Sequence, residues 1–244
     1  MKQLYVVGIG PGDYKKMTFE AVQTLENSEL IVGYTVYIEL VRRQFPEKTY
    51  LATGMRQERE RCEKALKAAD LGKKVSVVCS GDAGVYGMAG LLMELGASYP
   101  DVEIVVVSGI TAALSGAALL GAPLGHDFAV ISLSDLMTPW EQIERRLKGA
   151  AMADFCICLY NPSSRKRKDY LKRACDILLE YRLAETVCGL AQNIGREGEI
   201  TSICSLAELA GIPVDMFTTV FIGNSCTRQI KGQMVTPRGY YLQK

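Results

Sequence analysis

The amino-acid sequence predicts an α/β protein with mostly parallel sheets. Short apolar runs rich in Val and Ile alternate with amphipathic helical stretches along the whole chain, which is the pattern of strand–helix–strand units. Several of these runs end in glycines and small polar residues, and the carboxyl ends of parallel strands are where α/β proteins bind ligands. A stretch of small residues, 109–125, divides the chain into two α/β halves.

The apolar runs place the expected strands, and the small-residue stretch places the domain boundary. Strands are expected at 3–8, 75–79, 102–107, 128–133, 155–160, 186–191 and 217–222. Within "GITAALSGAALLGAPLG" a helix of Ala and Leu ends at Gly121 and Pro123. We therefore expect one domain over 1–121 and a second over 122–244.

Two helices carry strong local signals. The stretch "RQERERCEKALKAAD", 56–70, is expected to be a surface helix because its apolar residues fall at helical spacing, at Cys62, Ala65, Leu66 and Ala69. In "DLMTPWEQIERRL" we expect Thr138 as N-cap, Pro139 at the first helical position and Glu141 three residues after the cap.

Length, charge and hydropathy indicate a folded enzyme of the cytoplasm. At 244 residues and 48% hydrophobic composition the chain can bury a core. Lys+Arg 28 against Asp+Glu 27 gives a net charge of +1, so no global field favours nucleic acid or an anionic membrane. The apolar run of "MKQLYVVGIGPGD" is too short for a signal peptide, and no run reaches the roughly 18 apolar residues of a membrane span.

The cysteines and the single histidine do not indicate a metal site. The eight cysteines contain no CxxC pair and mostly lie in apolar runs, so we expect reduced core thiols. The nearest pair, Cys156 and Cys158, faces one side of an expected strand, without the second pair that zinc or an iron–sulfur cluster needs. His126 is expected to be a turn or packing residue rather than a catalyst.

The stretch "VVGIGPGD", 6–13, differs from a dinucleotide fingerprint. A Rossmann fingerprint has the form GxGxxG, opens a helix directly and is followed by a ribose-binding acid about 20 residues on. Here Pro11 removes one amide donor and disfavours immediate entry into a helix. The acid is also absent, because the second apolar run ends in Gly33 and Tyr34. What remains is either a tight loop or a turn without side chains, against which a flat ligand can lie.

In two further stretches an apolar strand also runs into glycines and small polar residues. These are "VVCSGDAGVYGMAG" at 77–90 and "VVVSGITAA" at 105–113. Asp82 in the first of them either caps a helix beginning near Gly84 or receives donors from a ligand. Three strand ends that each run into Gly and a small polar residue indicate one shared ligand better than three unrelated turns.

Together with "GYTVY", "GAPLGHDFAVISLSDLMTPWEQIERRL", "YNPSSRKR", "GREGE" and "TTVFIGNS", these motifs resemble the tetrapyrrole methylase family. The resemblance runs from residue 3 to about residue 240. Within the family the chain is similar to the branch that methylates C17 of the cobalamin precursors cobalt-factor III and precorrin-3B. The residues Ser80 and Ala83 stand where many members have Gly and Pro, which leaves only the details of backbone contact in doubt.

The resemblance implies two α/β domains with a cleft between them, S-adenosylmethionine (AdoMet) in the cleft, and a homodimer. The first domain would hold the tetrapyrrole trough and part of the AdoMet site, and the second domain the rest. Carried over by position, the cofactor residues are Pro11, Ser80, Gly81, Asp82, Val85, Tyr86, Thr111, Ala112, Tyr160, Asn161, Leu190, Ala191, Thr218 and Thr219. Asp13 falls where members line the trough that holds the macrocycle, and it is the candidate catalytic residue.

The chemistry that the resemblance implies needs no metal and no nucleophilic side chain. AdoMet carries an electrophilic methyl group, so the enzyme aligns a ring carbon with it and excludes water. The product is S-adenosylhomocysteine (AdoHcy), and in this branch methylation accompanies contraction of the macrocycle. Candidates for the proton that must move are Asp13, Ser132, Asp135 and His126.

Basic residues are expected near the substrate because the tetrapyrrole carries acetate and propionate carboxylates. The run Arg165, Lys166, Arg167 and Lys168 crowds an expected helix start, where the helix dipole disfavours cations. It is either an anion site or a solvated surface run. The loop with Arg196 and Glu197 presents the same two alternatives.

Several alternatives stay open from the sequence. The nearest is methylation of a different tetrapyrrole carbon by a sister enzyme. More distant ones are an RNA or protein methylase, which the charge disfavours, an NAD-binding oxidoreductase, and a non-catalytic nucleotide-binding module. The sequence does not decide whether the substrate already carries cobalt.

Overall fold

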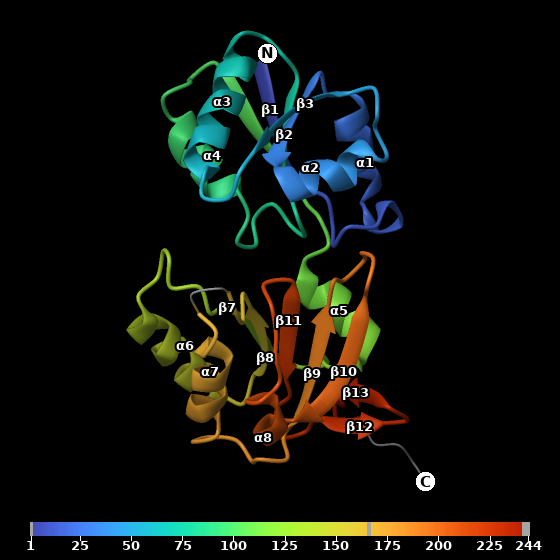
Figure 1. Ribbon diagram of the computed structural model, residues 1–244, viewed down its shortest axis with the longest axis vertical. Helices are drawn as coiled ribbons and strands as arrows, with labels where there is room; N and C mark the ends of the chain where they lie inside the picture. Colours follow the sequence, from blue (N-terminus) through green and yellow to red (C-terminus); the bar gives the residue numbers. More distant parts are fainter. Residues whose placement is uncertain (1, 165–166, 241–244) are drawn as a thin grey trace. The chain divides into compact units, whose positions relative to one another are not determined.

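The computed structural model describes residues 2–164 and 167–240. The chain divides into two compact units, Met1–Ala112 and Ala113–Lys244 (Figure 1). Strands and helices alternate in both units, which confirms the α/β class that the sequence predicts. Among the described residues, no helix is both long and apolar enough to cross a membrane.

The first unit contains a five-stranded parallel sheet with the order β3-β2-β4-β1-β5. Its strands are β1 (Lys2–Gly8), β2 (Leu30–Tyr34), β3 (Thr49–Thr53), β4 (Val75–Cys79) and β5 (Val102–Val107). The parallel pairing was predicted, and so were β1, β4 and β5. The strands β2 and β3 were not among the expected ones. The strand β3 lies at the sheet edge, and its sequence, TYLAT, has no continuous apolar run.

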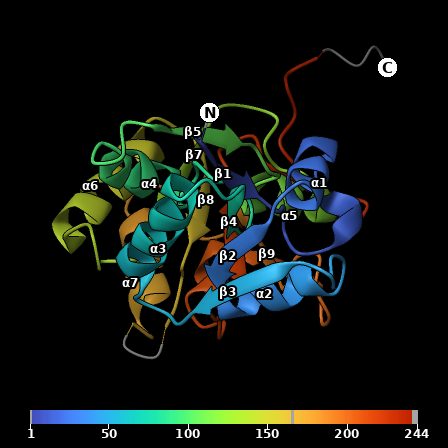
Figure 2. The ribbon, with the colours of Figure 1, turned by 90° about the horizontal axis from the view of Figure 1, so that it is seen from above.

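Helices cover both faces of this sheet, which explains why its central strands are apolar throughout. One face packs against α3 (Glu58–Asp70) and α4 (Ala89–Gly96), and the other against α1 (Phe19–Glu26) and α2 (Thr35–Arg42) (Figure 2). Side chains of β1 alternate between the two cores, with Val6 in one and Val7 in the other. A short 3₁₀ helix, η1 (Tyr14–Lys16), follows β1.

The second unit contains a mixed sheet with the order β10-β9-β11-β8-β7. Its strands are β7 (Phe128–Ser132), β8 (Cys156–Tyr160), β9 (Val187–Gln192), β10 (Ile200–Ser205) and β11 (Thr218–Ile222). Only the pair β7–β8 is parallel. The expectation of mostly parallel pairing therefore fails in this unit. The reason is that β9 and β10 form an antiparallel pair after a short connection, and β11 then inserts antiparallel to both β9 and β8.

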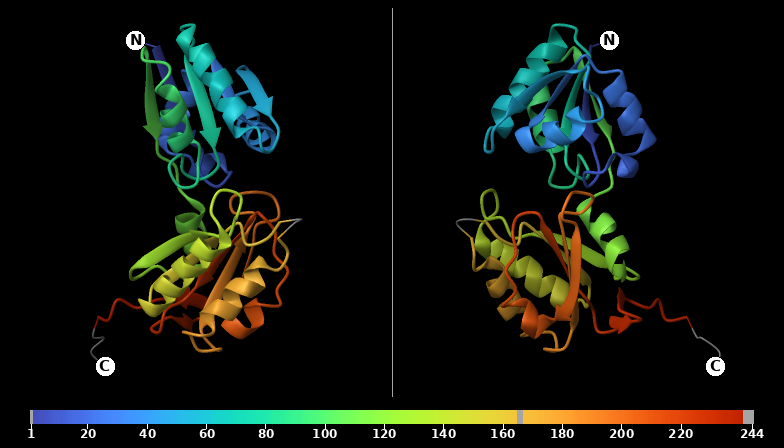
Figure 3. Two further views of the ribbon diagram at one scale, coloured as in Figure 1. Left: turned by 90° about the vertical axis from the view of Figure 1, so that its left-hand side faces the viewer. Right: turned by 45° about the vertical axis from the view of Figure 1, so that its right-hand side comes forward.

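The remaining elements complete the second unit. The helices α6 (Trp140–Met152), α7 (Tyr170–Leu178) and α8 (Leu206–Leu209) cover one face of the sheet (Figure 3). A small sheet has the order β12-β13-β6 and consists of β6 (Gly121–Ala122), β12 (Arg228–Ile230) and β13 (Gln233–Val235).

All of the helix α5 (Ala112–Leu120) except its first residue lies in the second unit, Ala113–Lys244. A Cβ atom on Gly116 would lie 2.8 Å from the ring of Phe221 and 3.0 Å from Ile194. This close packing of α5 on the face opposite α6 and α7 is a tertiary contact between distant residues. No local pattern within 109–125 encodes it.

The two helices with strong sequence signals are present. The helix α3 buries Cys62, Ala65, Leu66 and Ala69 as predicted. The helix α6 begins one residue later than predicted, because Pro139 has an extended ψ of 145° and is itself the N-cap in place of Thr138. The eight cysteines are free, and all but Cys204 and Cys226 are buried. This confirms the predicted core thiols for those six residues.

Candidate cofactor site

The three glycine turns of the first unit lie together. They follow β4, β1 and β5, which are neighbours in the sheet and end at the same edge because they are parallel. Gly10 and Gly81 pair directly: the Gly10 amide donates to the Gly81 carbonyl at 3.0 Å, and the Gly81 amide donates to the Gly10 carbonyl at 2.7 Å. Both have φ near +70°, at +68° and +71°, a conformation that favours glycine. The strand ends expected to share a ligand therefore do meet.

The third turn contacts the other two so closely that side chains are excluded. A Cβ atom on Gly109 would lie 2.2 Å from the Gly81 carbonyl oxygen and 2.6 Å from the Gly8 carbonyl carbon. A Cβ atom on Gly8 would lie 2.7 Å from the Gly109 amide nitrogen. These glycines are required by backbone packing, and they leave a surface of backbone groups above the sheet.

Asp82 holds the second and third turns together. Its Oδ1 accepts from the amides of Gly84 at 2.8 Å and Val85 at 3.2 Å, and its Oδ2 accepts from the amide of Gly109 at 2.9 Å. The helix-capping alternative does not hold, because α4 begins only at Ala89. Because its carboxylate accepts hydrogen bonds from three backbone amides of the protein, Asp82 positions the turns.

The other candidate residues of the first unit surround this arrangement. A Cβ atom on Gly81 would lie 3.5 Å from Thr111 Cα and 3.7 Å from the Ala112 amide. Tyr86 has a φ of +54° and is 56% exposed, so its ring is accessible beside the second turn. Pro11 is buried, while Ser80 and Val85 are half-buried.

The candidate residues of the second unit lie at one end of its sheet. The register pairs Thr218 with Gln192 and Thr219 with Ala191. Val220 pairs with Leu190 on one side and with Leu159 on the other. Tyr160, the next residue of β8, therefore reaches the same edge as Ala191 and Thr219.

Hydrogen bonds fix Tyr160 and its neighbour Asn161 at this edge. The Tyr160 hydroxyl accepts from the Ala113 amide at 2.6 Å, so it holds the first turn of α5. Asn161 has a φ of +53°, and its Nδ2 donates to Ser132 Oγ at 3.0 Å. The sequence singled out Ser132 only as a proton-transfer candidate, whereas in the structure it orients Asn161.

The candidates for proton transfer do not form one cluster. Asp13 is exposed and caps η1, and its Oδ1 accepts from the Lys15 amide at 3.0 Å. In the second unit, His126 is exposed and precedes β7, while Ser132 ends that strand. The two residues therefore lie at opposite ends of β7.

Asp135 is bound by the segment that precedes α7. Its Oδ2 accepts from the Tyr170 hydroxyl at 2.7 Å and its Oδ1 from Arg167 Nη1 at 3.1 Å. The hydrogen bond from Tyr170, followed by the charge of Arg167, lowers the pKa of the Asp135 carboxyl from its ordinary value. Asp135 is therefore an ionised anchor rather than a proton donor at neutral pH.

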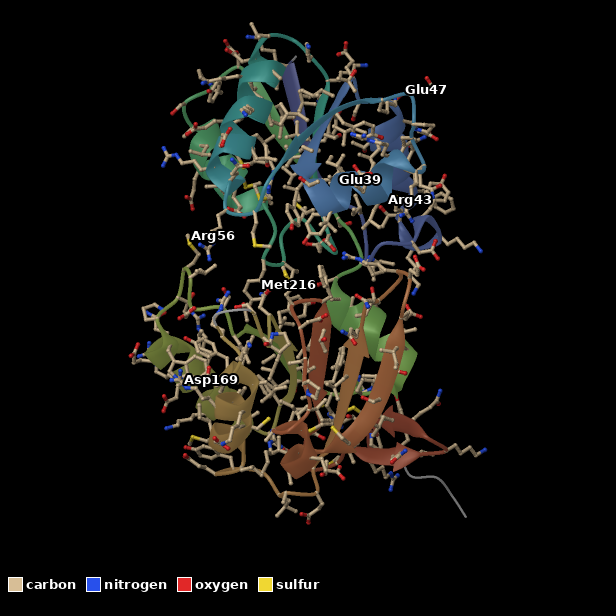
Figure 4. All side chains as sticks on the ribbon, viewed as in Figure 1. Glu39, Arg43, Glu47, Arg56, Asp169 and Met216 are labelled. Atoms are coloured by element: carbon tan, nitrogen blue, oxygen red, sulfur yellow. The ribbon has the colours of Figure 1, made fainter. Side chains whose placement is uncertain are left out.

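Of the predicted basic run, Arg167 and Lys168 are described, and Arg165 and Lys166 lie outside the described residues. Arg167 is occupied by Ser134 and Asp135, and Lys168 is exposed. The helix α7 begins at Tyr170 after Asp169 (labelled in Figure 4), so both cations precede the helix rather than crowd its first turn. The second loop holds Arg196 over the ring of Phe217 at 5.5 Å, and Glu197 is exposed.

The candidate residues fit AdoMet chemically. None of the cofactor candidates is a lysine or arginine, and Asp82 is the charged member of the set, so the set suits a cationic sulfonium. The turns without Cβ atoms allow a flat adenine to approach the backbone. Among the described residues, no group of three or more His, Cys, Asp or Glu side chains could hold a metal ion.

Comparison with known proteins decides the family. The family described as Tetrapyrrole (Corrin/Porphyrin) Methylases matches residues 3–210. The chain belongs to this family. It is 47% identical over 240 residues to a probable cobalt-factor III C(17)-methyltransferase of Salmonella typhimurium, with 98% of this chain and 100% of that protein covered. It is 40% identical to a precorrin-3B C(17)-methyltransferase of Sinorhizobium sp, with 97% and 96% covered.

Some relatives are longer. The chain is 42% identical to a cobalt-factor III methyltransferase of Priestia megaterium, and the match covers 98% of this chain but 45% of that protein. The chain therefore corresponds to one part of that relative.

Solved structures of this tetrapyrrole methylase fold agree with the architecture. The crystal structure of the methyltransferase CobJ superposes with a TM-score of 0.91 at 37% identity and covers 97% of this chain and 100% of that one. A uroporphyrin-III C-methyl transferase from Thermus thermophilus, complexed with S-adenyl homocysteine, has a TM-score of 0.71 at 20% identity, with 91% and 97% covered. The second likeness shows the fold alone.

Proposed function

We propose that this tetrapyrrole methylase transfers a methyl group from AdoMet to C17 of cobalt-factor III or precorrin-3B, with contraction of the macrocycle to cobalt-precorrin-4 or precorrin-4. The observation that carries the proposal is the meeting of three glycine turns at neighbouring strand ends, locked by Asp82. Support for the substrate comes from relatives named for this reaction that match this chain over nearly its whole length.

The cofactor supplies an electrophilic methyl group and leaves as AdoHcy. The residues of this chain provide binding and orientation. The backbone of the turns at Pro11, Ser80 and Gly81 receives one side of the cofactor, and Asp82 keeps the turns in register. The proposed set in the second unit is Tyr160, Asn161, Leu190, Ala191, Thr218 and Thr219.

We propose that both sets bind one AdoMet molecule. The first set ends at Thr111 and Ala112, and the next residue, Ala113, donates its amide to Tyr160 of the second set. Asp13, exposed after the first turn, is proposed to line the tetrapyrrole trough. We further propose that the enzyme is a cytoplasmic homodimer, with neither nucleic acid nor membrane as partner.

The decisive experiment is incubation of the protein with AdoMet and either cobalt-factor III or precorrin-3B. Mass analysis should find a product with one added methyl group together with AdoHcy, and NMR of a ¹³C-methyl product should place the methyl at C17. A methyl group at another carbon would instead assign the chain to a sister activity of the family.

Cofactor binding separates this proposal from the nicotinamide alternative. Calorimetry should detect binding of AdoHcy and none of NAD. A protein that bound NAD and ignored AdoHcy would overturn the proposed function.

A further inference from the structure

Arg61 is a buried cation that has only neutral partners. It lies in the first turns of α3 and is 4% exposed. Its Nε donates to Thr53 Oγ1 at 2.7 Å and its Nη2 to the Gly54 carbonyl at 3.0 Å. The partner of Nη1 is the thioether sulfur of Met88 at 3.8 Å, which is a weak acceptor.

No acid of the described residues compensates this charge. Within residues 2–164 and 167–240, Arg61 forms no ion pair. The acids of α3 nearest in sequence have other partners. Glu60 pairs with Lys64 at 2.6 Å, Glu63 pairs with Arg59 at 2.9 Å, and Glu58 accepts from the Arg56 amide at 3.3 Å. A buried charge is normally paired, and the first turn of a helix adds further positive potential. Both effects favour an anion at this position.

The guanidinium lies at the ligand-binding edge of the first sheet, beside the glycine turns. Thr53 is the last residue of β3, and the ring of Tyr34, the last residue of β2, lies 6.0 Å from the guanidinium carbon. Met88 donates its backbone amide to Cys79 Sγ at 3.4 Å, at the end of β4. Arg61 thus covers the ends of β3, β2 and β4, whereas the glycine turns occupy β4, β1 and β5.

A ligand can reach this group from the surface. Gly54 is exposed and lies in the loop that leads past Arg56, labelled in Figure 4, into α3. Met88, the N-cap of α4, is half-buried. Binding at Nη1 requires the Met88 side chain to rotate away, and methionine is a flexible side chain. The planar guanidinium then offers the donor geometry that matches a carboxylate.

We propose that Arg61, with Thr53 and Tyr34, forms a subsite that binds a carboxylate side chain of the tetrapyrrole, which replaces the Met88 sulfur at Nη1. This proposal rests on the proposed function. AdoMet also carries a carboxylate, but the ends of β2 and β3 lie beside the glycine turns rather than on them. The tetrapyrrole is therefore the source to which the subsite is assigned.

The first test is Arg61→Gln, with Arg59→Gln as the matched control. Arg59 is on the same helix, but its side chain is 77% exposed, so the control removes the same charge from the surface. The probes are cobalt-factor III, followed by absorbance titration, and AdoHcy, followed by calorimetry. We expect Arg61→Gln to raise the Kd of cobalt-factor III at least tenfold and to change the Kd of AdoHcy less than twofold. Arg59→Gln should leave both unchanged.

A second pair of variants keeps Arg61 in place, in case its replacement prevents folding. Met88→Glu supplies an internal carboxylate to Nη1, and Met88→Gln has the same shape without the charge. We expect Met88→Glu to bind cobalt-factor III at least tenfold more weakly than Met88→Gln, with a melting temperature at least as high. Equal affinity of these two variants would overturn the subsite.

Three further outcomes test the subsite and the proposed function separately. If folded Arg61→Gln binds cobalt-factor III as the wild type does, the carboxylate subsite is rejected while the proposed function stands. If Arg61→Gln loses AdoHcy binding and keeps tetrapyrrole binding, the assignment to the tetrapyrrole is wrong. A wild-type protein that binds no tetrapyrrole overturns both the proposed function and the subsite.

Discussion

Asp82 links two of the glycine turns of the first unit through its carboxylate. Its two carboxylate oxygens accept from three amides on two separate turns, and each hydrogen bond to a charged group contributes about 1.5–3 kcal/mol. The residue therefore couples the loop after β4 to the loop after β5. Its effect on a ligand is indirect, through the backbone that it fixes.

Replacing Asp82 by Ala should weaken AdoHcy binding roughly tenfold or more, because the second and third turns lose their link. Calorimetry with AdoHcy measures this change. Asp70→Ala is the matched control, since Asp70 pairs with Lys2 at the other end of the sheet and such surface pairs contribute about 0–1 kcal/mol. Unchanged affinity in Asp82→Ala would remove Asp82 from the site.

Asp135 should make stability depend on pH in a defined direction. Its pKa is lowered in the folded protein, chiefly by the hydrogen bond from Tyr170, so its contribution is present above the ordinary Asp pKa of about 4. That contribution is lost as the pH falls through the lower, folded pKa. We expect Asp135→Asn to unfold at lower urea than the wild type at pH 7, and the difference to shrink as the pH falls below about 4. A difference that persists at low pH would contradict this linkage.

At the scale of elements, local patterns predicted most strands of the first unit but not their contacts. The strands β4 and β5 have the predicted bounds, 75–79 and 102–107, because their Val-rich runs are strong strand signals. The strand β3 has no such run. The cap of α6 was displaced by one residue, because Pro139 has an extended ψ of 145° and is itself the N-cap.

The close contact of three turns gives a test at the level of these elements. Gly109→Ala should lower the free energy of unfolding by about 1–3 kcal/mol and weaken AdoHcy binding, because its Cβ would lie 2.2 Å from the Gly81 carbonyl oxygen. Gly90→Ala is the matched control. Gly90 lies in α4 with nothing within 4 Å of a new Cβ, so it should raise stability by up to ~1 kcal/mol. Urea unfolding measures the free energy of unfolding of both variants. Equal changes in Gly109→Ala and Gly90→Ala would contradict the close contact of Gly109 with the other turns.

At the scale of the whole molecule, the two units differ in strand direction although the central strands of both are apolar and buried. The first sheet is parallel, and the second has one parallel pair. Apolar strands from either kind of sheet have similar sequences when helices cover them. The direction of β9, β10 and β11 therefore depends on chain connections and core packing rather than on the strands' own residues.

The reactivity of the cysteine thiols tests whether the hydrophobic cores of both units are packed as the structure describes. Burial raises the pKa of Cys62 and Cys175 to about 12 and that of Cys204 to about 11, so these thiols stay protonated at pH 8. With a disulfide reagent at pH 8, we expect Cys226, the exposed thiol, to react first. The six buried thiols should react only after denaturant is added.

Cys226→Ser should abolish the fast phase of this thiol titration. A fast phase that persists in Cys226→Ser, or several fast thiols in the wild type, would show that the buried cysteines are accessible in solution.

The sequence by itself determined the α/β class, the glycine turns at strand ends and the family. Each of these can be recognised from short continuous segments such as "VVGIGPGD", because it depends on residues that are neighbours in the chain. The tertiary structure decided which turns meet, that Asp82 accepts from Gly109, and that α5 packs with the second unit. It also decided that Arg61, one charge among many in α3, is buried without a counter-charge. These features depend on contacts between residues far apart in the chain, whose pairing is set by the packing of whole sheets and helices rather than by neighbouring residues.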